Sequence, residues 1–80
     1  MRAKILIRLK EDVPDSAGRV LQERVAHLGF TDVLEARVGK LVELEFEGSD
    51  RDGAINRIKN MCKQVLVNAS IEDYEILSVE

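Results

Sequence analysis

Residues 42–47 alternate apolar and acidic side chains without a break, in a segment that begins with Leu41. The apolar members are Val42, Leu44 and Phe46, and the acidic members are Glu43, Glu45 and Glu47. An alternation of this kind is typical of a β-strand that has one face in a core and the other in water. Because the pattern does not match the 3.6-residue period of a helix, it predicts that this segment belongs to a sheet.

A second alternating segment, residues 3–9, and the lysine that follows it carry the opposite charge. The odd positions are apolar, the cations are Lys4, Arg8 and Lys10, and Leu6 is the one apolar residue on the charged face. Opposite charges on neighbouring strands contribute about 0.2–1 kcal/mol per pair. We therefore expect residues 3–9 and 41–47 to be adjacent strands, with these cations facing the three glutamates.

Two segments place apolar residues at helical spacing, and they predict helices over residues 16–28 and 50–66. The residues that can cap their first turns are Asp15 or Ser16 in the one and Ser49 or Asp50 in the other. Gly29 is expected to end the first helix, because glycine adopts the positive φ of a helix terminus without strain. The apolar stripes are Ala17, Val20, Leu21, Val25 and Leu28 in the first helix, and Ala54, Ile55, Ile58, Met61, Cys62, Val65 and Leu66 in the second.

Two further segments predict strands with weaker patterns. Residues 31–38 place Leu34, Ala36 and Val38 on one face, and the turn at residues 39–40 would join them to residues 41–47 as a hairpin. Residues 71–79 form the last predicted strand, in which neither face is wholly polar. An edge strand of that two-sided character favours contact with another chain.

The predicted order is strand, helix, strand, strand, helix, strand, which is the order of a ferredoxin-like split βαβ fold (βαββαβ). We expect one α+β domain over residues 1–80, with a four-stranded antiparallel sheet in the order 4-1-3-2 and two helices on one face. A chain of this size buries only roughly 60% of its unfolded surface, so its stability is expected to depend on association.

The sheet face without helices has two possible interpretations. It can be an ordinary solvated face, in which Lys4, Arg8 and the glutamates only specify strand pairing. Alternatively, Leu6 and Leu41 among these charges can mark a face that packs on another subunit.

Composition excludes several classes of partner. The formal net charge is −3 and only 4% of residues are aromatic, which argues against a surface that binds nucleic acid. No apolar run is long enough for a signal peptide or a membrane span. Cys62 is the only cysteine, which fits a reducing cytoplasm. We therefore expect a cytoplasmic protein with no nucleic acid and no membrane among its partners.

No catalytic or metal-binding set is predicted. His27 is the only histidine and is expected to be a surface or cap residue at the end of the first helix, far from any nucleophile pattern. Cys62 lies on the apolar stripe of the second helix, where burial raises a thiol pKa and makes it a packing residue. Glu43, Glu45 and Glu47 are expected to lie beside cations, which favour the charged carboxylate and make these residues poor general acids.

Activities common on this fold lack their sequence features as well. The connection after the first strand is acidic and has no phosphate-binding glycines and no Cys-x-x-Cys, which disfavours an acylphosphatase and a copper chaperone. The central strands carry no aromatic pair for stacking RNA bases. A regulatory module that binds a small molecule between paired βαββαβ units remains an alternative, although such modules have a glycine turn after the first strand and this chain has no glycine before Gly18.

Several segments in a fixed order resemble one family. They are residues 4–10, residues 28–30 (Leu-Gly-Phe), residues 35–40 leading into 42–44, residues 61–68 and residues 71–75. Together they cover essentially the whole chain and resemble the PurS family, the small subunit of phosphoribosylformylglycinamidine synthase. One departure is Ala69, which stands where the family often has proline after the asparagine.

The resemblance implies a role in the conversion of formylglycinamide ribonucleotide to formylglycinamidine ribonucleotide in purine biosynthesis. In that family a large synthetase subunit uses ATP and Mg²⁺, and a glutaminase subunit releases ammonia from glutamine. The small subunit self-associates and bridges the other two, which helps ammonia transfer. The resemblance therefore implies a required but non-catalytic subunit of a carbon–nitrogen ligase, with no cofactor bound to this chain and with a dimer or tetramer as its own state.

Partner contacts are predicted in two places. Arg37, Gly39 and Lys40 would form a positively charged docking turn, unless they serve hairpin geometry alone. Asn68, Glu72 and Tyr74 match the family's pattern near the C-terminus, and Tyr74 can be either an interface anchor or a core residue.

Overall fold

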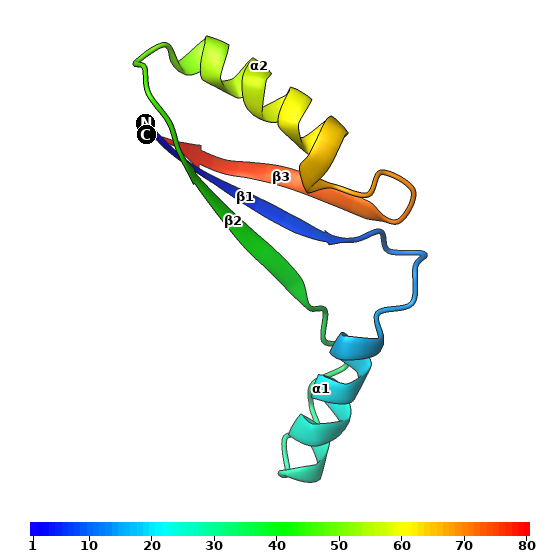
Figure 1. Ribbon diagram of the computed structural model, residues 1–80. Helices are drawn as coiled ribbons and strands as arrows, with labels where there is room; N and C mark the ends of the chain where they lie inside the picture. The colour runs from blue at the N-terminus through cyan, green and yellow to red at the C-terminus, as the bar shows by residue number, and fades with distance from the viewer.

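The computed structural model describes all 80 residues and contains three strands and two α-helices (Figure 1). In chain order the elements are β1 (Arg2–Leu9), α1 (Ser16–His27), β2 (Gly39–Glu45), α2 (Arg51–Met61), the π-helical turn η1 (Cys62–Leu66) and β3 (Glu72–Val79). The predicted α+β class with an antiparallel sheet is confirmed. The prediction of a fourth strand is wrong.

The sheet has the order β2-β1-β3, and both pairings are antiparallel. Ala3 lies opposite Leu44 on one side and Val79 on the other, so the apolar residues of all three strands share one face. The predicted neighbours of the first strand are therefore confirmed. The charge pattern contributes as expected where the strands overlap: Lys4 pairs with Glu43 at 3.9 Å on the opposite face of the sheet. Arg8, in contrast, lies opposite Gly39 and not opposite a glutamate.

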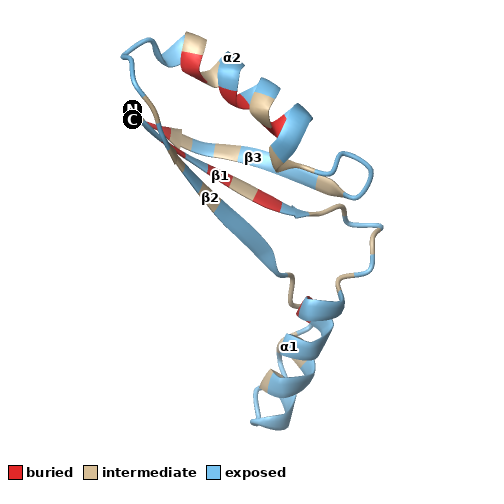
Figure 2. Ribbon diagram, in the orientation of Figure 1, coloured by how far each residue is buried: buried red, intermediate tan, exposed pale blue.

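The core forms where α2 packs on the apolar face of the sheet, near the two chain termini (Figure 2). Its buried residues are Ala3, Ile5, Ile7, Ala54, Ile58, Cys62 and Val79. Asp50 caps α2 by accepting a hydrogen bond from the Gly53 amide at 3.1 Å, which confirms one of the two predicted caps. The helix runs through residue 66 as predicted, but its last turn is a π-helix, closed by the bond from the Val67 amide to the Cys62 carbonyl at 3.1 Å.

Residues 31–38 do not form the predicted strand, and residues 39–40 open β2 instead of forming a hairpin turn. The reason is that side chains of α1 and of its cap residue form hydrogen bonds with backbone groups of this segment, which a sheet would otherwise pair. The side-chain amide of Gln22 donates to the carbonyls of Val33 (3.3 Å) and Leu34 (2.8 Å), and the Val38 amide donates to Asp15 at 2.8 Å. The segment therefore runs beside α1.

The prediction that both helices cover one face of the sheet is wrong for α1. Figure 1 shows α1 projecting beyond the end of the sheet, on the side away from the termini. The chain is consequently elongated, with principal extents of 48 × 25 × 14 Å. We call residues 16–38 the arm. No helix in the chain is of sufficient length and apolarity to cross a membrane.

Candidate partner-binding site

The structure brings Lys40, Glu72 and Tyr74 together at the end of the sheet nearest the arm. Ile7 of the central strand lies between Lys40 on β2 and Tyr74 on β3 in the strand register. The Lys40 ammonium forms an ion pair with Glu72 at 3.7 Å on the face of the sheet that carries Ile7, which is the face on which α2 packs. These residues come from segments more than 30 positions apart, and only the pairing of both strands with β1 places them in one cluster.

Asn68 joins this cluster through the loop before β3. Its backbone amide donates to the Glu72 carboxylate at 2.8 Å, and its side-chain oxygen accepts from the Ser70 amide at 3.2 Å. The Glu72 amide in turn donates to the Asn68 carbonyl at 2.7 Å. These bonds close the loop around Ala69, so the start of the last strand is fixed without the proline that the family often has there.

Tyr74 is 39% exposed, so its ring is available to a partner as well as to the sheet. It lines an open groove of about 870 Å³ between β3 and the arm. The residues around the groove are Arg8, Leu9, Lys10, Glu11, Asp12, Glu35, Arg37, Asp73, Tyr74 and Glu75. A wide, mostly charged groove suits the surface of another protein better than an apolar small molecule, which prefers an enclosed pocket.

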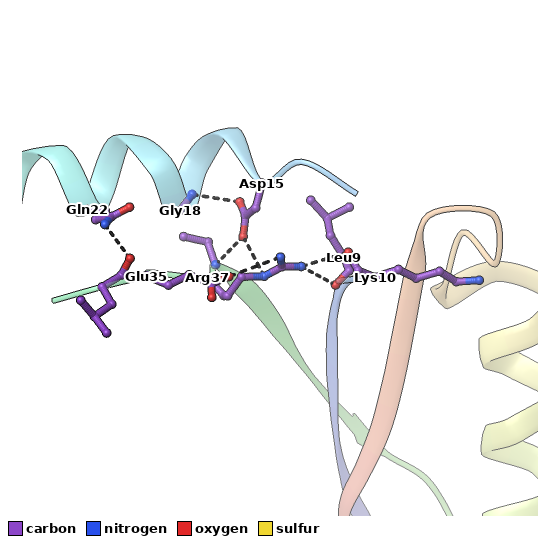
Figure 3. A network of polar contacts seen from close by, with 9 residues as sticks. Leu9, Lys10, Asp15, Gly18, Gln22, Glu35 and Arg37 are labelled. Carbon is purple, nitrogen blue, oxygen red and sulfur yellow. Dashed lines mark hydrogen bonds and ion pairs between the residues drawn. The ribbon is translucent and has the colours of Figure 1, made fainter. Parts of the chain in front are cut away.

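Arg37 lies in a network that joins the arm to the sheet, shown in Figure 3. One guanidinium nitrogen donates to the carbonyls of Leu9 (2.8 Å) and Lys10 (3.0 Å) at the end of β1. The same side chain pairs with Asp15 at 3.8 Å and with Glu35 at 3.7 Å, and it is only 28% exposed. We call these contacts of Arg37 and Asp15 the neck. Arg37 therefore holds the arm, and its role as a contact for a partner stays a prediction.

Asp15 is the other half of the neck. Its carboxylate caps α1 by accepting from the Gly18 amide at 2.9 Å, and it also accepts from the Val38 amide at 2.8 Å. These two hydrogen bonds, together with the Arg37 charge, lower the pKa of Asp15 below its ordinary value. Gly18 is required beside it, because a Cβ atom there would overlap the carbonyl oxygen of Ala36.

Protonation of Asp15 is expected to loosen the neck. Because the folded pKa is depressed, the stability that this carboxylate contributes is present above the ordinary pKa of 3.8 and is lost as pH falls through the folded value. NMR titration of the Gly18 and Val38 amides should therefore show a shared transition below pH 3.8. The variant Asp15→Asn, which cannot titrate, should lack that transition. A midpoint at or above the ordinary value would contradict this prediction.

Gly39 serves strand pairing. A Cβ atom at this position would lie 2.8 Å from the Ile7 carbonyl oxygen, so glycine allows β1 and β2 to approach at their last pair. This geometric role differs from the hairpin turn that the sequence predicted, and any contact of Gly39 with a partner stays a prediction.

Cys62 and His27 occupy separate parts of the molecule. Cys62 is fully buried in the core, where burial raises its thiol pKa, so the predicted packing role is confirmed. His27 is exposed in the last turn of α1, on the arm. No group of three or more histidine, cysteine, aspartate or glutamate side chains is arranged to hold a metal ion.

Sequence reasoning missed Gln22 and the second bond of Asp15. The sequence marked Asp15 as a helix cap, but its bond to Val38 spans 23 residues and has no local signal. Gln22 follows Leu21 in α1 and carries an amide that can donate to backbone carbonyls. This hydrogen-bonding capacity is the only sequence signal for its contact with residues 33–34.

Comparison with known proteins identifies the family. The family model for PurS, phosphoribosylformylglycinamidine (FGAM) synthase, matches residues 2–80. The PurS subunit from Bacillus subtilis is 38% identical over 73 residues, covering 91% of this chain and 86% of the relative. The structure of PurS from Methanocaldococcus jannaschii is 32% identical, with a TM-score of 0.85 over 99% of this chain and 98% of that one.

A chain in the structure of PurLQS from Thermotoga maritima is similar as well, with 26% identity, a TM-score of 0.83 and coverage of 99% of both chains. These matches extend over the arm as well as the sheet, and the chain belongs to the PurS family of phosphoribosylformylglycinamidine synthase subunits.

Proposed function

We propose that this chain is the non-catalytic small subunit of phosphoribosylformylglycinamidine synthase, bridging the synthetase and glutaminase subunits and supporting ammonia transfer between them. The observation that carries the proposal is the match of residues 2–80 to the family model. The likeness to a chain of PurLQS over 99% of both chains supports the same role. The reaction served is the ATP- and glutamine-dependent conversion of formylglycinamide ribonucleotide to formylglycinamidine ribonucleotide in the cytoplasm.

The shape of the chain fits a bridging role. A molecule 48 Å long with a projecting helix offers separate surfaces to two partners. Its open groove has a charged lining, which favours a polar protein surface as its ligand. In this proposal the synthetase subunit binds ATP and Mg²⁺, the glutaminase subunit binds glutamine, and this chain also associates with itself as a dimer or tetramer.

Reconstitution tests the role directly. Glutamine-dependent synthesis of formylglycinamidine ribonucleotide is measured with the synthetase and glutaminase subunits, with and without this chain, alongside size-exclusion chromatography in ADP and glutamine. We expect activity with glutamine only when the chain is added, and a joint elution peak. Ammonia as nitrogen donor is the control, because the synthetase alone should use it. Equal glutamine-dependent activity without the chain and separate elution would reject the proposal, and a screen for small-molecule ligands would follow.

Lys40 and Tyr74 are the proposed contacts for the synthetase subunit. We expect Lys40→Ala and Tyr74→Ala each to weaken binding, and Tyr74→Ala to weaken it by about 2 kcal/mol, or roughly 30-fold, if the ring is an anchor in the interface. Isothermal titration calorimetry with the synthetase subunit measures the change. Lys63→Ala, at an exposed lysine of η1, serves as the matched control and should bind normally. Unchanged affinity with intact folding would remove both residues from the interface.

A further inference from the structure

A second groove lies where the end of α2, the turn η1 and the start of β3 meet. Its volume is about 470 Å³. Three lysines from separate parts of the chain line it: Lys10 after β1, Lys59 on α2 and Lys63 on η1. Lys10 is half-buried, and Figure 3 shows its side chain extending away from Arg37. We call this space the lysine groove.

None of these three lysines forms an ion pair within the chain. The remaining lysines both do. Lys4 pairs with Glu43 at 3.9 Å, and Lys40 with Glu72 at 3.7 Å. All the lysines without a carboxylate partner are therefore gathered at one groove, although the chain as a whole has a net charge of −3. A local excess of positive charge in an acidic protein indicates a site for an anion.

The placement of Lys59 and Lys63 opposes the stability of the helix. The two lysines are four positions apart, so their side chains lie on one face and repel each other. The helix dipole favours a cation near this end, but it gives no reason for a third cation to arrive from the end of β1. The turn that carries Lys63 is a π-helix, a rare conformation that is frequent at functional sites. An anion bound between the ammonium groups would remove their repulsion.

The acidic residues that line the groove, Glu72 and Asp73, face other cations. Glu72 pairs with Lys40 and also accepts a hydrogen bond from the Asn68 amide at 2.8 Å. Asp73 lies opposite Arg8 in the register of β3 with β1, at the spacing of a cross-strand charge pair. The charge of the three lysines is therefore left for a ligand.

A phosphate group suits this arrangement better than a carboxylate. It carries a charge of about −1.5 to −2 at pH 7, and it presents acceptor oxygens in several directions. A lysine ammonium is a compact charge, so three of them from separate elements can each donate to a different oxygen. The planar fork of arginine matches a carboxylate, and no arginine lines the groove.

The groove has room for more than a phosphate group. Its volume lies within the range of small-molecule sites, which is about 300–1,000 Å³. Val67 and the ring of Tyr74, which is 39% exposed, add apolar surface to its lining. We propose that the lysine groove binds a phosphate-bearing small molecule, with the ammonium groups of Lys10, Lys59 and Lys63 around the phosphate. This site goes beyond the function proposed above and does not rest on it.

Titration of the full chain with pyrophosphate tests this site, because the probe consists of phosphate groups alone. NMR spectra of the backbone amides follow the titration, at an ionic strength held constant with sodium chloride because salt screens exposed charges. We expect saturable shifts for the amides of Lys10 and residues 59–69, with the amides of α1 unchanged. Shifts that rise without saturation, or that are centred elsewhere in the chain, would overturn the proposal.

Two double variants with the same change in net charge locate the site. Lys59→Gln, Lys63→Gln should raise the dissociation constant for pyrophosphate by about 10-fold or more, because it removes two charge-assisted hydrogen bonds. Arg2→Gln, Lys4→Gln is the matched control, since both residues are exposed on β1 and pair with glutamates of β2. It should bind as the wild type does, and circular dichroism should show both variants folded. Equal weakening in the two variants would show that only net charge matters and would reject the site.

Other probes identify the source of the phosphate group. Tighter binding of adenosine diphosphate than of pyrophosphate, with the difference lost in Tyr74→Ala, would support a nucleotide as the ligand. Equal or weaker binding of adenosine diphosphate would support a free phosphate or diphosphate. A short peptide of glutamates is the last probe. If it shifts the same amides and pyrophosphate does not, the groove is a docking site for an acidic protein segment and the proposal is wrong.

Discussion

Replacing Ile58 with alanine is expected to lower the free energy of unfolding by about 2–5 kcal/mol, a large share of the total stability. Ile58 has no exposed surface and packs from α2 onto the apolar face of the sheet, beside Ile5 and Ile7. Truncating a buried isoleucine costs about 2–5 kcal/mol through lost transfer energy and the cavity left behind. A domain of this size has only about 4–12 kcal/mol of total stability. With seven residues in the core, there is little other packing to compensate.

Chemical denaturation followed by far-UV circular dichroism measures this effect at fixed protein concentration, because association would raise the apparent stability. Ile58→Val is the graded comparison and should cost about 0.5–1.5 kcal/mol. Val65→Ala, at a position of η1 that is 81% exposed, should change stability by less than about 0.5 kcal/mol. Equal losses for Ile58→Ala and Val65→Ala would contradict the core as described.

Replacing Arg37 with methionine is expected to free the arm while the sheet and α2 stay folded. The substitution removes the hydrogen bonds to the carbonyls of Leu9 and Lys10 and leaves the shielded Asp15 carboxylate without its cation. Hydrogen bonds to charged groups are worth about 1.5–3 kcal/mol. Protection of the Val38 and Gly18 amides from hydrogen exchange should therefore fall by roughly 10- to 100-fold.

The two halves of the molecule should respond differently, because α1 makes no extensive contact with the sheet or with α2. Amides of β1 should keep their wild-type protection in Arg37→Met. The matched control is Arg19→Met, which removes an exposed ion pair with Glu23 inside α1 and should cost less than about 0.5 kcal/mol. Uniform loss of protection across the chain would show that the neck is part of the core and not a separate joint.

The sequence by itself determined the central part of this fold. The alternation in residues 3–9 and 41–47 fixes which faces are apolar, because side chains on a strand alternate with a period of two whatever the strand's neighbours are. The opposite charges of Lys4 and Glu43 then favour the pairing that the structure contains. The second helix and the core position of Cys62 followed from helical spacing for the same reason. Of the predicted site residues, Lys40, Glu72 and Tyr74 are gathered by this pairing.

Tertiary structure alone decided where the first helix and residues 31–38 lie. The first segment has the local pattern of a helix and the second that of a strand. Each pattern indicates which side of the segment is apolar, but it does not indicate which other segment covers that side. The Val38 amide could bond to a sheet or to Asp15, and the carbonyls of Val33 and Leu34 could bond to a strand or to Gln22. These alternatives differ only in contacts between residues 11–23 positions apart, which no local pattern records. The same contacts give Arg37 a role within the chain that its sequence position did not indicate, because its guanidinium binds two carbonyls and a carboxylate at the base of the arm. Its predicted contact with a partner stays a prediction.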